Sequence, residues 1–534
     1  MKQNLFIKTI ALLLFSAFSL HYCLAQDCKV PTATEYLDGN NINALIKNDG
    51  TLFFDPATNL AKFEVPKGSG KHTIYSSALW LGGWTLPEYQ GTLHLAAMRF
   101  GDLGGDFWAG PVSSSAEACE YYDNTWKITQ KQIDYHKTHY ADASYVMPWA
   151  IANWPAHGRV EYGESANLAP YRNVAGTASY EPALGDYPLI RGDQAVYFII
   201  NDAAGTHTET GGNPLGVEIL GMAYVFDSPD VVLQNCVFLS YELRNKSEQD
   251  YHDFYLGSFT DFDIGYAQDD YVGCDTLLNL SYGYNGMKID GNGEVGSYGE
   301  NPPAQGAMFL NQKMNSFVYY NNTGDPTNGE PRKNTPADYY NYLIARWLNG
   351  NHITYGGNGT DPESTPTNYM FSGDPVAGTG WTEYIAANAP GDRRGVMSAG
   401  PFTFSAGKTM TIDIALPWMQ DNHGGNNLSA ITLLKQAAED VQKFYDENLV
   451  SINENTLYDG KLLIYPNPSN GQFAINSETV VESIELYDML GRKVFTDTPK
   501  AQTMQINARL PQGMYLYRVV LQDNSVSSGK ILVK

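Results

Sequence analysis

Five aspartates lie within residues 261–275, and they are the residues of this chain best placed to do chemistry: Asp261, Asp263, Asp269, Asp270 and Asp275. Carboxylates this close repel one another unless a cation neutralises them, and Ca²⁺ does so well because it takes about six to eight oxygen ligands. Asp261 and Asp263 alternate, so an extended backbone would place both on one face. A glycine turn could return Asp269 and Asp270 to them. The segment predicts a Ca²⁺ site; the alternative is a solvated acidic loop whose side chains cap turns.

Other short patterns match catalytic or binding motifs only in part. His136 and His139 lie on one helical face, but Lys137 stands where a zinc protease has its general-base glutamate. Residues 290–294 resemble the start of an EF-hand loop, yet Val295 occupies the position that needs glycine. The sequence has no Gly-x-Ser-x-Gly nucleophile motif. We therefore predict no catalytic residues and favour a protein that is not an enzyme.

A secreted enzyme that binds polysaccharide or hydrolyses glycans is the alternative function. Glycosidases use two carboxyl groups roughly 5–10 Å apart, a distance that sequence cannot test. Aromatic rings can stack on sugars, and the candidate side chains are Trp80, Trp84, Trp108, Trp149 and Trp154. Core packing would explain these tryptophans equally well.

Short apolar strands must position the acidic residues. Residues 195–200, 217–226 and 231–243 are rich in β-branched and aromatic side chains, and a turn at 48–50 predicts a hairpin over 43–55. Residues 321–395 are typical of long surface loops, with one short helix or strand near 339–348. Few helices separate these strands, so we predict a mainly β protein with a β-sandwich-rich body.

Two helices are expected in this body. The first is a helical stretch near 126–140. The second is amphipathic, spans 429–447 and has Ser429 as its N-cap, because its apolar side chains share one face. We expect it to pack on a strand over 410–417. The apolar side chains are Ile431, Leu434, Ala438, Val441 and Tyr445.

Charge and cysteine content limit the partners and the compartment. The net charge of −24 argues against nucleic acid, since phosphate binding needs clustered Lys and Arg. It favours divalent cations as partners; the alternative is that the acidity only keeps an exported protein soluble. Four cysteines follow the N-terminal leader, an even number that predicts two disulfides in an exported chain. Three pairings are open, and buried free thiols are the alternative. These cysteines are Cys28, Cys119, Cys236 and Cys274.

The two ends of the chain carry export signals. Residues 1–25 have basic Lys2 and Lys8, an apolar core and a cleavage site, which predicts a signal peptide. Residues 461–534 begin Lys-Leu-Leu-Ile-Tyr-Pro-Asn-Pro and end Gly-Lys-Ile-Leu-Val-Lys. This tail resembles the type A C-terminal sorting domain of the type IX secretion system of Bacteroidota. The resemblance implies export through the periplasm, recognition of residues 461–534 by the translocon, and removal of the tail. The body would then be secreted or attached to the cell surface through lipopolysaccharide.

The tail pattern predicts a small seven-stranded Ig-like sandwich. Alternating side chains over 514–521 give one buried face. The expected strands are 462–465, 472–476, 483–487, 493–495, 504–507, 514–521 and 530–533.

The body also resembles a group of uncharacterised exported Bacteroidota proteins, loosely over about 40–450. The resemblance rests on residues 269–276, 284–286 and 298–304, and implies no established activity. We expect this order of domains: a signal peptide (1–25), an N-terminal β-rich region (26–184), a β-sandwich region with long loops and a closing helix (185–450), a linker (451–460) and the sorting domain (461–534).

Overall fold

The computed structural model describes residues 28–101, 104–115, 117–449, 462–465, 469, 471–488, 492–508, 510–522 and 526–533. The predicted signal peptide and linker lie outside the described residues. The chain divides into two compact units, 1–441 and 442–534. Strands dominate both units, as predicted for a mainly β protein.

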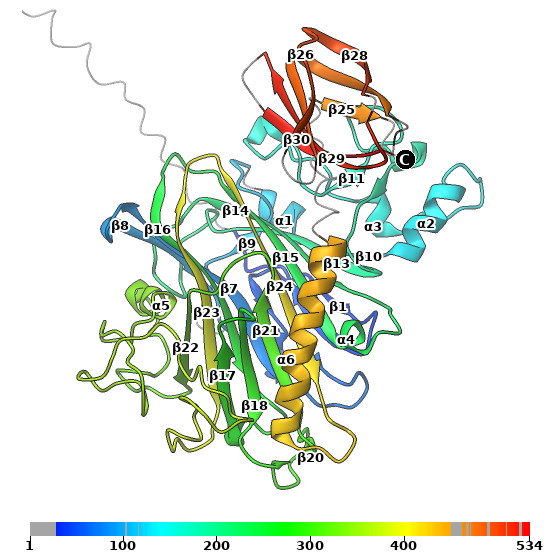
Figure 1. Ribbon diagram of the computed structural model, residues 1–534. Coiled ribbons are helices and arrows are strands. Elements are labelled where there is room, and N and C mark those ends of the chain that lie inside the picture. The colour runs from blue at the N-terminus through cyan, green and yellow to red at the C-terminus, as the bar shows by residue number, and fades with distance from the viewer. Residues whose placement is uncertain are drawn as a thin grey trace, which may run out of the picture. The chain divides into compact units, whose positions relative to one another are not determined.

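The first unit is built on two large antiparallel sheets (Figure 1). Sheet 1 has the order β1-β2-β3-β7-β16-β23-β22, with β6 beside β2 and β8 beside β7. Its strands are β1 (Thr34–Leu37), β2 (Asn43–Lys47), β3 (Thr51–Leu52), β6 (Phe63–Glu64), β7 (Ile74–Leu86), β8 (Gln90–Ala97), β16 (Tyr251–Phe262), β22 (Ser316–Asn321) and β23 (Arg393–Phe404).

Sheet 2 has the order β10-β13-β14-β15-β24-β21-β18-β17, with β9 beside β13. Its strands are β9 (Trp108–Ala109), β10 (Trp126–Thr129), β13 (Gln194–Asn201), β14 (Val217–Val225), β15 (Cys236–Asn245), β17 (Asp270–Asp275), β18 (Leu280–Asn285), β21 (Ala304–Phe309) and β24 (Thr409–Met419). The predicted boundary at residue 184 falls inside this unit, because β7 pairs with β16 across it.

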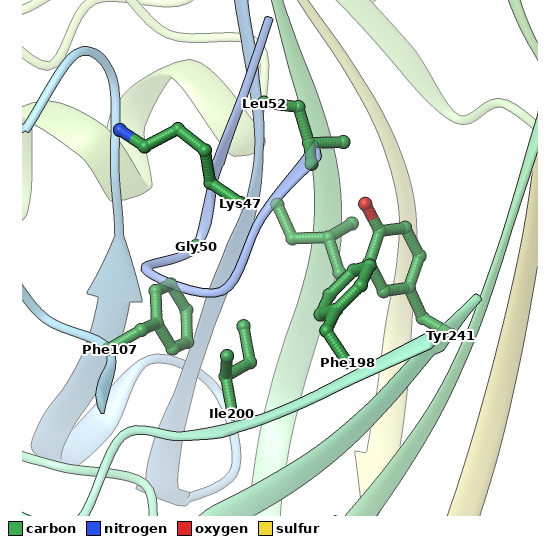
Figure 2. Close-up of a pocket in the computed structure, with 8 residues that line it drawn as sticks. Lys47, Gly50, Leu52, Phe107, Phe198, Ile200 and Tyr241 are labelled. Carbon is green, nitrogen blue, oxygen red and sulfur yellow. The ribbon is translucent and has the colours of Figure 1, made fainter. Parts of the chain in front are cut away.

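One hydrophobic core joins the facing sides of the two sheets. A cavity of about 10 Å³ between the sheets shows both contributions (Figure 2): Leu52 and Leu79 come from sheet 1, and Phe198, Ile200 and Tyr241 from sheet 2. The space holds about one water molecule, so the two sheets pack closely at this point.

Helix α5 (Pro336–Leu343) covers the outer face of sheet 1. Trp80 of β7 points away from the core side of its strand, lies parallel to Phe259 of β16 at a centroid distance of 5.5 Å, and meets Tyr339 of α5 edge-on at 4.9 Å. A Cβ atom at Gly257 of β16 would lie 2.3 Å from Leu343 Cδ2, so a larger residue there would force the buried Leu343 side chain to move.

Helix α6 (Asn427–Phe444) packs on sheet 2. Leu434 lies over Gly306 of β21, beside Pro417 of β24, which agrees with the predicted packing partner. The helix begins at Asn427 rather than at Ser429, because the Asn426 side chain accepts hydrogen bonds from the backbone N–H groups of Leu428 and Ser429. A short π-helical turn, η4 (Tyr445–Leu449), follows. The apolar face is buried as predicted.

Two other predicted elements change type where a side chain caps a helix. The stretch 126–140 starts as strand β10 and becomes α2 (Gln130–His139), because Thr129 and Gln132 form a capping box. The run 231–243 starts as helix α4 (Val231–Gln234), capped by Asp230, and becomes β15 only at Cys236. The remaining short elements are α1 (Ala118–Tyr121), α3 (Trp149–Ala152), η1 (Val160–Tyr162), η2 (Pro182–Leu184), η3 (Ala267–Asp269), and the strand pairs β4 (Phe54–Asp55) with β5 (Leu60–Ala61), β11 (Tyr171–Arg172) with β12 (Tyr187–Pro188), and β19 (Ile289–Asp290) with β20 (Gly299–Glu300).

The second unit contains the predicted tail strands. All seven predicted segments lie in strands, but two of them, 472–476 and 483–487, are joined in one long strand, β26 (Gln472–Asp488). Its first half pairs with β25 (Leu462–Tyr465) and β28 (Ala501–Asn507); its second half pairs with β27 (Lys493–Asp497) and β29 (Gly513–Leu521). Strand β30 (Val526–Val533) pairs with β29. Tyr515, Val519 and Leu521 are buried, which confirms the alternation over this strand.

One disulfide joins Cys28 to Cys119, whereas Cys236 and Cys274 are buried free thiols. The expectation of two disulfides is therefore half right. Cys236 and Cys274 lie on strands at different places in sheet 2 and pack as small apolar side chains. No helix among the described residues is long and apolar enough to cross a membrane.

Candidate functional site

The end of β16 and the start of β23 bring three carboxylates together on the outer face of sheet 1. Asp261 and Asp263 come from β16 and the residues directly after it; Asp392 directly precedes β23. One carboxylate oxygen from each lies within 4.8 Å of the others. We call Asp261, Asp263 and Asp392 the acidic group.

Strand pairing explains how this group forms. Asp261 is the register partner of Arg394 in β23, so their side chains leave the sheet on the same face. Arg394 Nη2 lies 3.2 Å from Asp261 Oδ2, and its Nη1 donates to Asp392. The guanidinium therefore ties two members of the acidic group together across the sheet.

The guanidinium of Arg99 connects the acidic group and Arg394 to two further carboxylates, and we call the whole set the charge cluster. Arg394 Nε lies 3.0 Å from Glu330 Oε1, and Glu330 also accepts from Arg99 Nη1. Arg99 Nε donates to Glu209 Oε1 at 2.9 Å. The charge cluster thus contains five carboxylates and two guanidiniums, a formal excess of three negative charges.

Burial of the charge cluster makes its excess negative charge energetically unfavourable. The side chains of Asp261 and Arg99 are each 1% exposed, and Asp261 Oδ1 has no hydrogen-bond partner among the described residues. Burial raises the pKa of Asp261 well above its ordinary value, and Asp263 and Asp392 raise it further, while Arg394 acts in the opposite direction. Burial, aided by Asp392, likewise raises the pKa of Asp263 to about 7. Without a further cation, the carboxyl groups of Asp261 and Asp263 therefore favour protonation.

Aromatic rings surround this charge. Tyr320 of β22 is stacked on Phe259 and on Tyr342, and its hydroxyl is buried without a hydrogen-bond partner among the described residues. Arg394 also lies over the Phe100 ring, 5.7 Å from its centroid. Walls of this kind keep the local dielectric constant low, which strengthens any ionic interaction formed there.

The other three predicted metal ligands lie in different surroundings. Asp269 accepts from Gly291 N–H, and Asp270 accepts from Ile264 N–H. Burial raises the pKa of both carboxyls, and Asp263 contributes to the rise at Asp270. Asp275 instead forms an ion pair with Lys435 of α6 at 3.1 Å. The structure thus brings together Asp261 and Asp263 of the five predicted residues.

Sequence reasoning missed the other members of the charge cluster. Asp392 and Arg394 lie about 130 residues from Asp261, in a region predicted to be loops, and Arg99, Glu209 and Glu330 come from three further segments. No local spacing links them. The one available signal was the acidic-basic run from Asp392 to Arg394 at the start of a strand.

The remaining sequence candidates are mostly structural. His136 is buried, and its Nε2 lies 2.9 Å from the Asp186 carbonyl oxygen. Trp80, Trp108 and Trp154 are buried, Trp84 is half-buried, and Trp149 is 54% exposed.

Residues 463–534 match the family of the secretion system C-terminal sorting domain. The tail is therefore a sorting domain of the type IX route, and the chain is one of that system's substrates, exported to the cell surface or beyond. The match does not extend to the body.

Comparison of the whole chain with other proteins finds distant similarities. An endo-acting ulvan lyase from Formosa agariphila is 25% identical over 111 residues, which is 20% of this chain and 22% of the lyase. This chain therefore spans about a fifth of that relative. Among solved structures, a polysaccharide lyase aligns over 60% of this chain and 34% of its own, with 9% identity and a TM-score of 0.19. PorZ, a surface component of the type-IX secretion system of Porphyromonas gingivalis, aligns over 66% of this chain and 45% of its own, with 9% identity and a TM-score of 0.13.

Proposed function

We propose that this exported protein has a non-catalytic surface, matrix or binding role, and that Ca²⁺ at the acidic group stabilises its body. The observation that supports calcium is the excess of three negative charges in a cluster that is mostly buried. A divalent cation would reduce that excess to one. Carboxylate oxygens are the ligands that Ca²⁺ prefers, and three carboxylates can supply up to six of them.

The geometry favours a cation that keeps some water. Asp261 is fully buried, whereas Asp263 and Asp392 are partly exposed, so solvent can complete the coordination shell. Ca²⁺ accepts such irregular shells, whereas Mg²⁺ needs near-octahedral geometry. The predicted ligands Asp269, Asp270 and Asp275 would then support the fold around the acidic group rather than bind the ion.

Thermal unfolding with Ca²⁺ or with EDTA tests this proposal. We expect Ca²⁺ to raise the melting temperature of the wild-type protein, because a ligand at about 100 times its Kd stabilises the folded state by about 2.7 kcal/mol. Asp261→Ala combined with Asp263→Ala should abolish the shift. Asp275→Ala, at a predicted ligand that pairs with Lys435, should retain it. An unchanged wild-type melting temperature would refute the calcium site.

A secreted enzyme that acts on polysaccharide is the second candidate function. The similarity to an ulvan lyase favours it, although it covers only 20% of this chain. Release of reducing ends or of unsaturated sugars from a polysaccharide would establish activity. A binding protein would retain the polysaccharide unchanged.

A further inference from the structure

The sorting domain carries a group of exposed apolar side chains on the outer face of its sheet. Met514 and Leu516 lie on β29 and Leu532 lies on β30, and each of the three is between 36% and 42% exposed. Tyr515 and Ile531, which alternate with them along the same strands, are buried in the core of the second unit. We call Met514, Leu516 and Leu532 the apolar patch.

Strand pairing places these side chains next to one another. Met514 is the direct partner of Leu532 across the β29–β30 ladder, and Leu516 follows two residues after Met514. Direct partners, and residues two apart on one strand, share a face of the sheet. On the other side of β29, Leu516 is the direct partner of Tyr487 of β26. The apolar surface therefore runs across β30 and β29 to the Tyr487 ring.

Ionic side chains border the apolar patch along the next row of the sheet. Glu485 of β26 is the direct partner of Arg518 of β29, and its Oε2 lies 3.5 Å from Arg518 Nη1. Glu485 also pairs with Lys493 and accepts a hydrogen bond from the Tyr487 hydroxyl at 2.8 Å. An apolar centre with a polar border is the usual anatomy of a protein–protein interface.

The fold of the sorting domain does not require apolar residues on this face. An antiparallel sheet with one solvated face normally alternates apolar residues inside with polar residues outside. Arg518 follows this rule on β29, whereas Met514 and Leu516 break it at the two preceding outward positions. Neighbouring apolar side chains in solvent commonly mark a surface that another molecule covers.

The charge of the tail indicates how a partner would recognise it. Residues 463–534 contain seven lysines and arginines against six aspartates and glutamates, whereas the whole chain contains 34 against 58. The tail is thus nearly neutral within a strongly acidic chain, so long-range electrostatic attraction contributes little to its recognition. Burial of apolar surface is then the main source of binding free energy.

We propose that the apolar patch is the surface through which the sorting domain contacts the type IX translocon, at a complementary apolar surface of that machinery. A sorting domain acts through its secretion system, which makes the translocon the partner that this face fits. The patch would supply the apolar contact, and Glu485 and Arg518 would border it. This inference concerns export, so it depends neither on calcium nor on the role of the body.

Export of the full chain from a strain with an active type IX system tests the proposal. Met514→Thr, Leu516→Thr and Leu532→Thr together remove the apolar surface but keep residues that favour strands. We expect roughly a tenfold loss of protein from the medium and surface fractions, with the full-length chain retained in the periplasm. Tyr465→Thr is the matched control: Tyr465 is 49% exposed on β25 of the same unit, and its replacement should leave export unchanged.

Circular dichroism and urea unfolding of the purified full chain establish whether the triple variant folds. If it does not, Leu516→Thr alone provides the test, with an expected loss of export of roughly threefold. Normal export of the folded variant would overturn the proposal, as would an equal loss with Tyr465→Thr. A wild-type dimer in sedimentation experiments that the variant cannot form would assign the patch to a contact between copies of this chain, which would also overturn it.

Discussion

Asp263→Asn should stabilise the metal-free protein at neutral and alkaline pH, although it removes a proposed calcium ligand. The folded-state pKa of Asp263 is raised from 3.8 to about 7, chiefly by burial. The folded state then binds more protons than the unfolded state between about pH 4 and pH 7, so stability falls as the pH rises through that window. Asparagine cannot ionise, so the variant does not lose this stability as the pH rises.

The size of the pKa shift of Asp263 determines how much stability the Asp263→Asn substitution should add. A rise of about three pKa units, at about 1.4 kcal/mol per unit, gives on the order of 4 kcal/mol as an upper bound. Asp263 is partly exposed, so solvent screens part of this penalty. We therefore expect the metal-free variant to be more stable than wild type by about 1–3 kcal/mol at about pH 8, and by much less at about pH 5.

Urea unfolding in EDTA at both pH values measures this difference, and a repeat in Ca²⁺ should reverse the order, because only the wild type then gains the ion. Asp275→Asn is the matched control: it removes an ion pair with Lys435 and should change stability by less than about 1 kcal/mol, with no reversal in Ca²⁺. A wild-type protein whose metal-free stability does not fall from pH 5 to pH 8 would refute the reasoning.

Three further predictions concern the scaffold and the export route. Reducing the Cys28–Cys119 disulfide, which closes a loop of sequence separation 91, should lower the free energy of unfolding by about 3–4 kcal/mol in chemical denaturation; an unchanged midpoint would contradict it. Gly257→Ala should destabilise the body by about 1–3 kcal/mol, because the new Cβ would lie 2.3 Å from Leu343, whereas Gly257→Ala combined with Leu343→Ala should relieve that clash. Deleting 463–534 should leave the protein inside the cell envelope rather than outside it, as immunoblots of the medium and surface fractions would show.

The periodicity of apolar side chains correctly predicted the elements that bury one face, such as β29 and α6. The alternation of Tyr515, Val519 and Leu521 and the spacing of Ile431 and Leu434 each identified a buried face correctly. The errors lie where a single side chain ends one element and begins another. Asp230 caps α4 at the start of a run that otherwise has strand composition. The hydrophobic pattern of the sequence does not reveal such a cap.

Of the candidate site, only the two aspartates at the end of β16 could be predicted from the sequence. Asp261 and Asp263 are two residues apart, so strand periodicity alone places them on one face. Arg394 and Asp392 are brought beside them by the pairing of β16 with β23, which follows β16 by about 130 residues. Glu330, which lies in a long loop, then pairs with Arg394. A pattern search over short windows cannot detect a charge balance that involves residues this far apart.

The register between β16 and β23 therefore decides whether the acidic group exists at all. Arg394 lies opposite Asp261, and Asp392, two residues before Arg394, follows the same alternation, so all three side chains leave the same face of sheet 1. A slip of one residue would turn Arg393 to that face. Arg393 instead binds Glu383 at 3.0 Å from the opposite side of the strand. The two adjacent arginines thus fix the register from both faces, and each neutralises a different set of buried carboxylates.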